Sequence, residues 1–549
     1  MMEARLAVGA EFFEFVNVMQ EFLIAHDREK NAGNTFELAV EDPTWTPDPM
    51  KCFIRKIPFD TPAVIFNHVV DAYRDMSRRL DTMHTRAPLN IARVCKSWRE
   101  VALEIPSLWT QIGPSSAPFI HTFLARSKSE ILDIFWNPTK LPSPTGASQG
   151  PDRAISFFRP LRDHVHRLKR LDIWYTPLSV YERCLDSPAP NLEEIYASDS
   201  LNRALLEPSH APPILFGGHT PRLRKLYLSY VWIPLDSPML TNLVYLQIEH
   251  ILYIRSQPIQ LIKVLGACPA LETVQLTNLR FLAGSFIPTM LVNLFHLKKF
   301  ILYEMPLNVV RYILASITTL PTTHLVLNLA DATLNTTYPS DVDLATRSPS
   351  IARIRHFYAS SRYDPLERDN IVIKGYDGPE REGSAQLMTL EFQNLQPPAM
   401  ETVLPSLERL PMPLLESVEL VDFSHATFTP AKLASFLANF TTITTLPLRD
   451  EATRFAHILI FTAESRLCPA LRTLRIWRSD IRAKKLVKLV KSRQASDCHL
   501  EAIELRDCKS INRAGVEKLE ALSVMVKWFE EEHMDTPLDP SAAVPGSSG

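Results

Sequence analysis

The sequence predicts a mixed α/β protein in which short strands alternate with helices in a stack of repeated units, preceded by a helical module. Three observations support this prediction. A short apolar pattern recurs from about residue 165 onward. Apolar segments of helical spacing separate its copies, and residues 86–109 place apolar side chains on one helical face. Because strand side chains alternate between two faces, each unit needs a neighbour to cover its apolar face.

Composition favours a soluble, multidomain protein of the cytoplasm or nucleus. The chain has 549 residues, 46% of them hydrophobic, and its 59 Lys and Arg nearly balance 61 Asp and Glu. We therefore expect no general attraction to nucleic acid or acidic lipid. Seven scattered cysteines without a C-x-x-C pair predict reduced thiols. The apolar runs are shorter than the roughly 20 residues of a membrane helix, and no secretory signal is expected.

The chain divides into segments by pattern and composition. Residues 1–53 predict a helix and a linker of no assigned role, and residues 54–112 form the helical module. A connector with a Pro/Ser-rich loop follows at 113–164. The repeats occupy 165–528, with an irregular insertion at about 331–386, and residues 529–549 predict a disordered tail.

The helical module holds apolar and aromatic residues in a defined order. They are Ile57, Pro58, Ile65, Phe66, Val94, Cys95, Trp98, Leu108 and Trp109. This order resembles the F-box, and its ending is closest to fungal members of that family. Asp60, where the family has Glu, and a polar insertion at 75–86 depart from the family pattern.

The resemblance to the F-box implies a three-helix domain that docks on a Skp-type adaptor of cullin–RING ubiquitin ligases. It also implies that the nine apolar and aromatic residues of the module, from Ile57 to Trp109, contact the adaptor. Trp98 and Trp109 are expected to tie the module together as well. Docking of this kind places large apolar side chains of an amphipathic helix in a partner's groove.

The repeated pattern is an apolar residue, two others, an apolar residue, one other and an apolar residue. Strong copies begin at residues 168, 223, 243, 271, 297, 387, 415, 443, 471 and 500, and weaker ones at Leu192 and near Thr322 or Ile354. The last four copies begin 28 or 29 residues apart. This lies in and just above the range of about 20–29 residues typical of leucine-rich repeats.

Two helices of the repeats are predicted to end at the same junction, Cys-Pro-Ala-Leu, at 268–271 and 468–471. Proline cannot continue a helix and favours extended geometry before it. The junction and the pattern resemble the leucine-rich repeats of many F-box proteins. The resemblance implies a solenoid with parallel strands on its concave face and helices on its convex face.

Residues that flank the apolar strand positions are predicted to lie on the concave face, where this family binds partners. We expect a protein substrate to contact Arg170, Trp174, Lys225, Tyr227, Tyr245, Tyr303, Arg475 and Trp477. Tyrosine, tryptophan and arginine are enriched at interface hot spots. The alternative for each position is an ordinary solvated sheet face. The mixed signs of charge do not indicate nucleic acid.

No catalytic residue, metal site or cofactor is predicted. Only 15 glycines occur, and neither phosphate-binding glycine motif is found. His164 and His166 do not share a helix face, and Cys498, His499 and Cys508 lack a suitably spaced fourth ligand. The resemblance therefore implies a non-catalytic substrate-recognition subunit whose partners are an adaptor, a cullin and a protein substrate. A scaffold that binds partners without ubiquitin transfer is the alternative.

Overall fold

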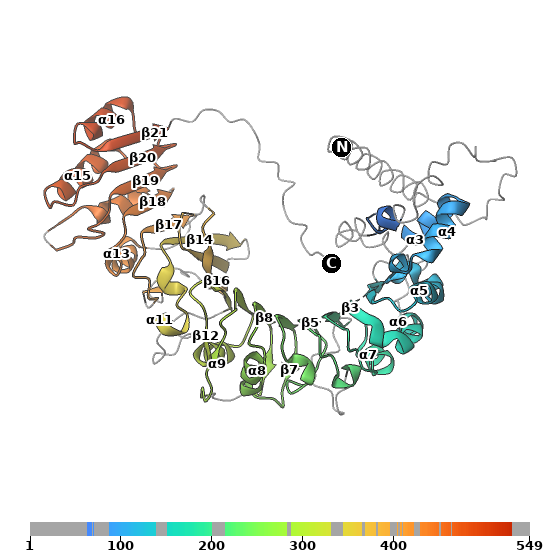
Figure 1. The fold of residues 1–549 in the computed structure, drawn as a ribbon. Helices are drawn as coiled ribbons and strands as arrows, with labels where there is room; N and C mark the ends of the chain where they lie inside the picture. The colour runs from blue at the N-terminus through green and yellow to red at the C-terminus, as the bar shows by residue number, and fades with distance from the viewer. Residues whose placement is uncertain are drawn as a thin grey trace, which may run out of the picture. The chain divides into compact units, whose positions relative to one another are not determined.

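The protein is a mixed α/β structure whose strands are mostly parallel (Figure 1). The computed structural model describes residues 63–68, 70, 87–138, 151–199, 215–282, 287–330, 344–364, 368–379, 383–395, 403, 407–408, 410–421, 429–449, 452–462 and 464–529. The chain forms two compact units: residues 1–245 with 250–252, and residues 246–249 with 253 onward. None of the described helices combines the length and hydropathy needed to cross a membrane.

The described part of the first unit begins with short helices. Residues 63–68 are helical, and α3 (Ala87–Val94), α4 (Lys96–Glu104) and the 3₁₀ helix η3 (Pro106–Trp109) follow. Between α3 and α4, Cys95 has extended backbone, and its Sγ accepts a hydrogen bond from the Trp98 N–H at 3.4 Å. The predicted helical module is therefore helical from residue 87 to Trp109.

In the described part of the first unit, five parallel strands form the sheet, and each pairs with the next in chain order. They are β1 (Gln111–Ile112), β2 (Leu132–Trp136), β3 (Leu168–Ile173), β4 (Glu194–Ser198) and β5 (Lys225–Ser229). The other helical elements of this unit are η4 (Pro114–Phe119), α5 (Ile120–Arg126), α6 (Pro151–Phe158), η6 (Arg159–Arg167), α7 (Leu178–Cys184), η7 (Leu215–Gly218) and η8 (Pro238–Leu240). Parallel neighbours require crossover connections, and the helical elements from η4 to η7 lie in these connections. The predicted alternation of strands and helices is therefore confirmed in this unit.

Side chains of β3 show how the sequence pattern becomes a core. Leu168, Leu171 and Ile173 are buried, whereas Arg170 and Asp172 between them are only half-buried. Helices α6 and α7 lie on one side of the strands (Figure 1). Burial of each large aliphatic side chain contributes about 1.5–3 kcal/mol, so the recurring pattern provides much of the stability of the stack.

The second unit contains a longer ladder of strands. In chain order they are β6 (Tyr245–Glu249, its first residue in the first unit), β8 (Thr273–Thr277), β11 (Lys299–Tyr303), β13 (His324–Ala330), β14 (His356–Asp364), β15 (Arg368–Tyr376), β16 (Gln386–Leu395), β17 (Ser417–Val421), β18 (Thr445–Arg449), β19 (Thr473–Trp477), β20 (Ala502–Arg506) and β21 (Met525–Phe529). Short strands β7 (Leu252–Tyr253), β9 (Arg280–Phe281), β10 (Val292–Asn293) and β12 (Ile317–Thr318) lie outside this ladder.

The expectation of parallel strands throughout the stack is wrong at one place. The chain pairs β13 with β16 and β14 with β17 in parallel, but β15 lies antiparallel between β14 and β16. Only residues 365–367 separate β14 from β15, too few for the crossover that a parallel neighbour requires. The segment predicted as an irregular insertion at 331–386 thus contributes two long strands to the sheet.

Helices accompany the strands of the second unit on one face (Figure 1). They are α8 (Pro258–Gly266), α9 (Leu307–Ser316), α11 (Leu344–Arg347), η9 (Ile351–Arg353), α13 (Pro430–Ala438), α14 (Ala452–Phe455), η11 (Ala456–Leu459), α15 (Ala483–Gln494) and α16 (Arg513–Glu520). The first predicted Cys-Pro-Ala-Leu junction, at 268–271, follows α8, and the second, at 468–471, precedes β19. Cys268 and Cys468 are both buried.

A buried arginine donates hydrogen bonds to the backbone at the second of these junctions. Arg493 of α15 is fully buried and donates hydrogen bonds to the backbone oxygens of Leu467 (3.2 Å) and Cys468 (2.6 Å). Its guanidinium carbon lies 4.3 Å from the centre of the Phe461 ring. A buried carbonyl left without a donor costs about 1–3 kcal/mol, so Arg493 fixes helix α15 against the turn before β19.

Candidate binding surfaces

Most residues predicted to contact an adaptor are buried within the chain. Ile57 and Pro58 lie outside the described residues, while Ile65, Phe66, Trp98, Leu108 and Trp109 are buried and Cys95 is half-buried. Of the predicted residues that the structure describes, Val94 is exposed, at 40%. A buried side chain cannot reach a partner without rearrangement, so the expectation of direct contact is not supported for the five buried residues.

The buried aromatic residues hold the helical module together. The Phe66 and Trp98 rings lie 4.9 Å apart, and the Trp109 indole N–H donates to the Ala102 oxygen at 2.8 Å. The Trp109 ring also meets Phe123 of α5 edge-on, with centroids 5.1 Å apart. Trp109 therefore ties the module together and also contacts the following helix, α5.

Exposed apolar side chains remain on the module. Val64 in the helix at residues 63–68 is 52% exposed, and Val94 at the end of α3 is 40% exposed. Val64 was not singled out from the sequence, because Ile65 and Phe66 beside it carry the family resemblance. Among the described residues of the module, these two valines are the large apolar side chains classed as exposed.

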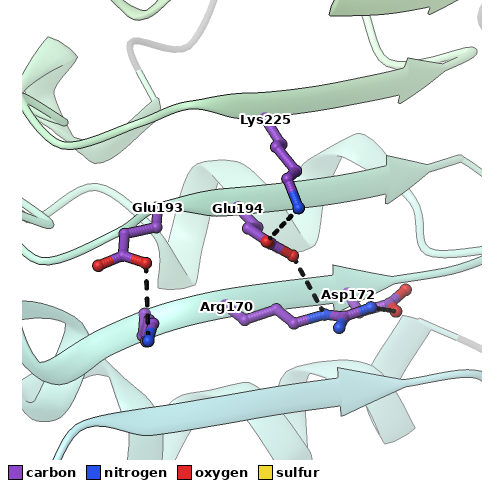
Figure 2. Close-up of polar contacts among 6 residues, drawn as sticks. Arg170, Asp172, Glu193, Glu194 and Lys225 are labelled. Atoms are coloured by element: carbon purple, nitrogen blue, oxygen red, sulfur yellow. Dashed lines mark hydrogen bonds and ion pairs between the residues drawn. The ribbon is translucent and has the colours of Figure 1, made fainter. Parts of the chain in front are cut away.

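On β3, β4 and β5, charged residues form a continuous network across the first unit's sheet (Figure 2). The register aligns Arg170, Glu194 and Lys225 in one row. Arg170 lies 3.9 Å from Glu194 and 3.4 Å from Asp172, and the Lys225 ammonium lies 2.8 Å from Glu194. The hydrogen bond to Glu194 raises the pKa of Lys225. These charges neutralise one another.

Aromatic rings lie beside this network. The Trp174 and Tyr227 rings are 5.5 Å apart, and Tyr227 and Tyr196 are 6.3 Å apart. The Arg170 guanidinium lies 5.2 Å from the centre of the Tyr196 ring, and burial raises the pKa of the Tyr196 hydroxyl. We call Trp174, Tyr196, Tyr227 and Arg170 the aromatic surface. It joins four residues from three strands, among them Arg170, Trp174 and Tyr227 as predicted.

Tyr196 was missed by the sequence analysis. Its strand β4 belongs to the weak copy at Leu192, where Ala197 replaces a large apolar residue. The register places Tyr196 directly beside Asp172 and Tyr227. The signal that could have found it is the alternation of Ile195, Tyr196 and Ala197, which assigns the tyrosine to the same face as Trp174 and Tyr227.

In the second unit, predicted residues on β11 and its neighbours join a polar network. The Tyr303 hydroxyl accepts a hydrogen bond from Gln393 at 3.1 Å, and Asn328 donates to Glu391 at 3.2 Å. Tyr245, at the boundary of the two units, is half-buried, and its N–H bonds to the Arg224 oxygen. Tyr303 and Tyr245 are thus partly accessible, but Tyr303 is held by its neighbours.

At the other end of the second unit, arginines alternate with aromatic rings across four strands. Arg449 lies 4.6 Å from the centre of the Trp477 ring, and Arg506 lies 5.3 Å from that of Phe529. The register sets Arg449, Trp477, Arg506 and Phe529 side by side on β18 to β21. Trp477 was predicted; Phe529 was not, because it was assigned to the tail.

Acidic side chains balance part of this positive charge. Arg475 and Lys527 lie 2.8 and 3.1 Å from Glu504, and Arg449 lies 2.9 Å from Glu419. Burial alone would raise the pKa of Glu504, but the hydrogen bond from Lys527 and the charge of Arg475 outweigh it and lower that pKa. Arg475, predicted as a substrate contact, therefore has an internal partner.

Over the described residues, no group of three or more His, Cys, Asp and Glu side chains is placed to hold a metal ion. His164 lies against Arg167 (3.3 Å), and burial lowers its pKa. His499 is 3.2 Å from Asp497, while Cys508 is buried beside backbone oxygens. These residues have local structural contacts.

Neither the models of known protein families nor the curated proteins gave a match to this chain. A function for the chain therefore has to be proposed from the sequence patterns, from the exposed valines of the helical module and from the aromatic surface.

Proposed function

We propose that the protein is the substrate-recognition subunit of an SCF-type ubiquitin ligase. In this proposal an F-box-like helical module binds a Skp-type adaptor, and a leucine-rich-repeat solenoid binds a protein substrate. The aromatic surface is the observation that carries the proposal. Its aromatic rings are accompanied by charges already paired within the chain, which suits a protein partner better than a polyanion.

The mechanism in this proposal is proximity. Docking at one end of the chain and substrate capture on the strands raise the effective concentration of substrate lysines near the charged ubiquitin carrier. The chain itself then performs no bond chemistry, and its contribution is the geometry that holds two partners at once.

A scaffold role without ubiquitin transfer is the second candidate, and one observation favours it. Phe66, Trp98 and Trp109, expected at the adaptor interface, are buried among the chain's own residues. Adaptor docking must then use Val64, Val94 and residues outside the described part, such as Ile57 and Pro58.

Adaptor docking is tested by co-purification with a recombinant Skp-type adaptor and cullin. We expect Val64→Asp with Val94→Asp to weaken capture about tenfold or more, because charge replaces apolar contact at the interface. Ile131→Asp is the matched control: it is 44% exposed but lies outside the module. Capture of adaptor without cullin would favour the scaffold, and no capture by the wild-type chain would refute docking altogether.

The substrate surface is tested separately, by affinity capture from cells with the proteasome blocked. We expect Tyr196→Ala with Tyr227→Ala to lose captured proteins that Lys169→Ala retains, with adaptor binding unchanged in both. Lys169 is an exposed residue of the same sheet, paired with Glu193 at 3.6 Å. If the double variant kept the same captured proteins, substrate binding would have to occur elsewhere.

A further inference from the structure

The ladder of the second unit ends at β21, and this end is open in the part of the chain that the structure describes. There β21 pairs with β20 alone, in parallel, with Met525 beside Ala502 and Phe529 beside Arg506. A strand at the end of a sheet offers unpaired main-chain groups to another strand.

The hydrogen bonds identify which groups of β21 are unpaired. The Met525 N–H donates to the Glu501 oxygen at 3.0 Å, and the Phe529 oxygen accepts from Asp507 at 3.5 Å. In a parallel pair the main-chain groups of successive residues point to opposite sides. The N–H and C=O groups of Val526 and Trp528 therefore point away from β20.

The side chains of β21 also lack a cover. Val526 and Trp528 are in register with Ile503 and Leu505, which are fully buried, yet both are only half-buried. On the opposite face, Met525 is 63% and Phe529 47% exposed.

Natural edge strands are usually protected by charged side chains, especially lysine, by proline or by bulges. In β21 neither proline nor glycine occurs, and its one charged residue, Lys527, is held by Glu504. The edge is therefore chemically suited to accept a strand.

We propose that this edge binds a second copy of the chain, with the two β21 strands antiparallel across a two-fold axis. A strand paired with itself can place Val526, Lys527 or Trp528 on the axis. With Trp528 on the axis, Lys527 lies opposite Phe529 of the second copy and Trp528 meets its equivalent on the apolar face. With Val526 there, Lys527 lies opposite Met525. Only the register centred on Lys527 opposes like charges.

The charges of the neighbouring helix favour the same occupant. α16 packs against the end of the sheet with Val516 and Leu519 buried. It carries Arg513 at its start, 3.6 Å from Glu517 of the same helix, and Glu517, Lys518 and Glu520 toward its end, so that the end keeps one net negative charge. A two-fold axis reverses the direction of the second helix, so the basic start of one α16 lies toward the acidic end of the other. The end of the stack is thus complementary to itself in hydrogen bonding, apolar surface and charge.

The test is sedimentation velocity of the full chain over a range of concentrations, comparing wild type with Val526→Pro. Proline removes the outward N–H and leaves the bonds to β20 in place. We expect reversible dimerisation that weakens about tenfold or more in the variant, because each copy loses a hydrogen bond at the interface. Leu282→Asp, which removes a distant apolar group of 50% exposure, should dimerise like wild type.

Hydrogen exchange distinguishes loss of the interface from loss of the fold. Amides of Val526 and Trp528 should gain protection at high concentration only, while those of β20 stay protected in the proline variant. A wild-type chain that is monomeric at all concentrations would overturn the proposal, as would dimerisation abolished by Leu282→Asp. Dimerisation that appears only after removal of residues 530–549 would assign the edge to the chain's own tail instead.

Discussion

At the scale of single residues, buried ionisable side chains determine local stability through contacts that no sequence pattern reveals. Arg493 is fully buried against two backbone oxygens, and His324 is half-buried at the start of β13. His324 Nε2 lies 2.9 Å from the Thr389 hydroxyl. Burial, with a smaller effect of Lys299, lowers the pKa of His324 to about 4.

The lowered pKa of His324 predicts a specific pH dependence. In the unfolded chain this histidine titrates near pH 6.5, so below that pH the unfolded state binds a proton that the folded state refuses until about pH 4. Stability should therefore fall across this window, by at most about 3 kcal/mol from this one group. Urea unfolding near neutral pH and near pH 4 measures it.

The variant His324→Gln should lose less stability than wild type over the same pH window, because glutamine does not titrate. His499→Gln is the control: this ring is exposed beside Asp497, and the variant should follow the wild-type curve. Parallel curves for wild type and His324→Gln would show that this histidine does not contribute to the pH dependence.

At the scale of elements, seven strands, β3, β5, β6, β8, β11, β19 and β20, end in the same backbone turn. Two residues after the second buried strand residue, the chain adopts positive φ: Tyr175 (51°), Tyr230 (58°), His250 (55°), Asn278 (48°), Glu304 (50°), Arg478 (51°) and Asp507 (56°). Left-handed geometry costs an ordinary residue about 1–2 kcal/mol. The stack therefore imposes this conformation on residues that do not prefer it.

Glu304 tests this strain, because its side chain is exposed and its φ is 50°. Glu304→Gly should raise the free energy of unfolding by about 0.5–1 kcal/mol, since glycine adopts the left-handed region freely and offsets its own entropy cost. Glu304→Ala is the matched control, which removes the carboxylate but keeps Cβ and should give no gain. Equal effects of the two variants in chemical denaturation would contradict the strain argument.

The strands could be predicted from the sequence, whereas the left-handed turns that end them could not. Strands with two large apolar residues, such as β5 and β20, were predicted because their burial alternates with the pattern. The turns were not, because five of the seven positions carry Tyr, His, Glu or Arg, and only Asn278 and Asp507 are of a type that often marks a left-handed residue. In the helical module, order along the chain placed Phe66 and Trp98 together, but could not show that they face inward.

At the scale of the whole molecule, the antiparallel strand β15 separates two parallel parts of the second unit's ladder. The sequence predicted an irregular segment at 331–386 but could not show its form, because that form depends on the pairing of β13 with β16 and of β14 with β17, which lie apart in sequence. The aromatic surface was predictable only in part for the same reason. Alternation assigns a face, whereas register, which brings Tyr196 beside Tyr227, requires the neighbouring strands.

Gly375 of β15 shows how tightly this strand is fitted. A Cβ atom at Gly375 would lie 2.6 Å from Ile354 Cδ1 and 3.0 Å from Cγ1, and Ile354 is fully buried. Gly375→Ala should therefore destabilise the second unit by about 1–3 kcal/mol through overpacking. The two units need not unfold together, so hydrogen exchange of β14, β15 and β16 is the appropriate measurement.

Two further variants separate overpacking at Gly375 from a general effect of removing glycine. At Gly378 an added Cβ would meet only Ser384, at 3.4 Å, so Gly378→Ala should leave exchange in these strands unchanged. Ile354→Val removes the closest atom, so its combination with Gly375→Ala should cost less than the sum of the single changes. Strict additivity would mean that the clash is relieved elsewhere, and that β15 is free to shift between its two antiparallel neighbours.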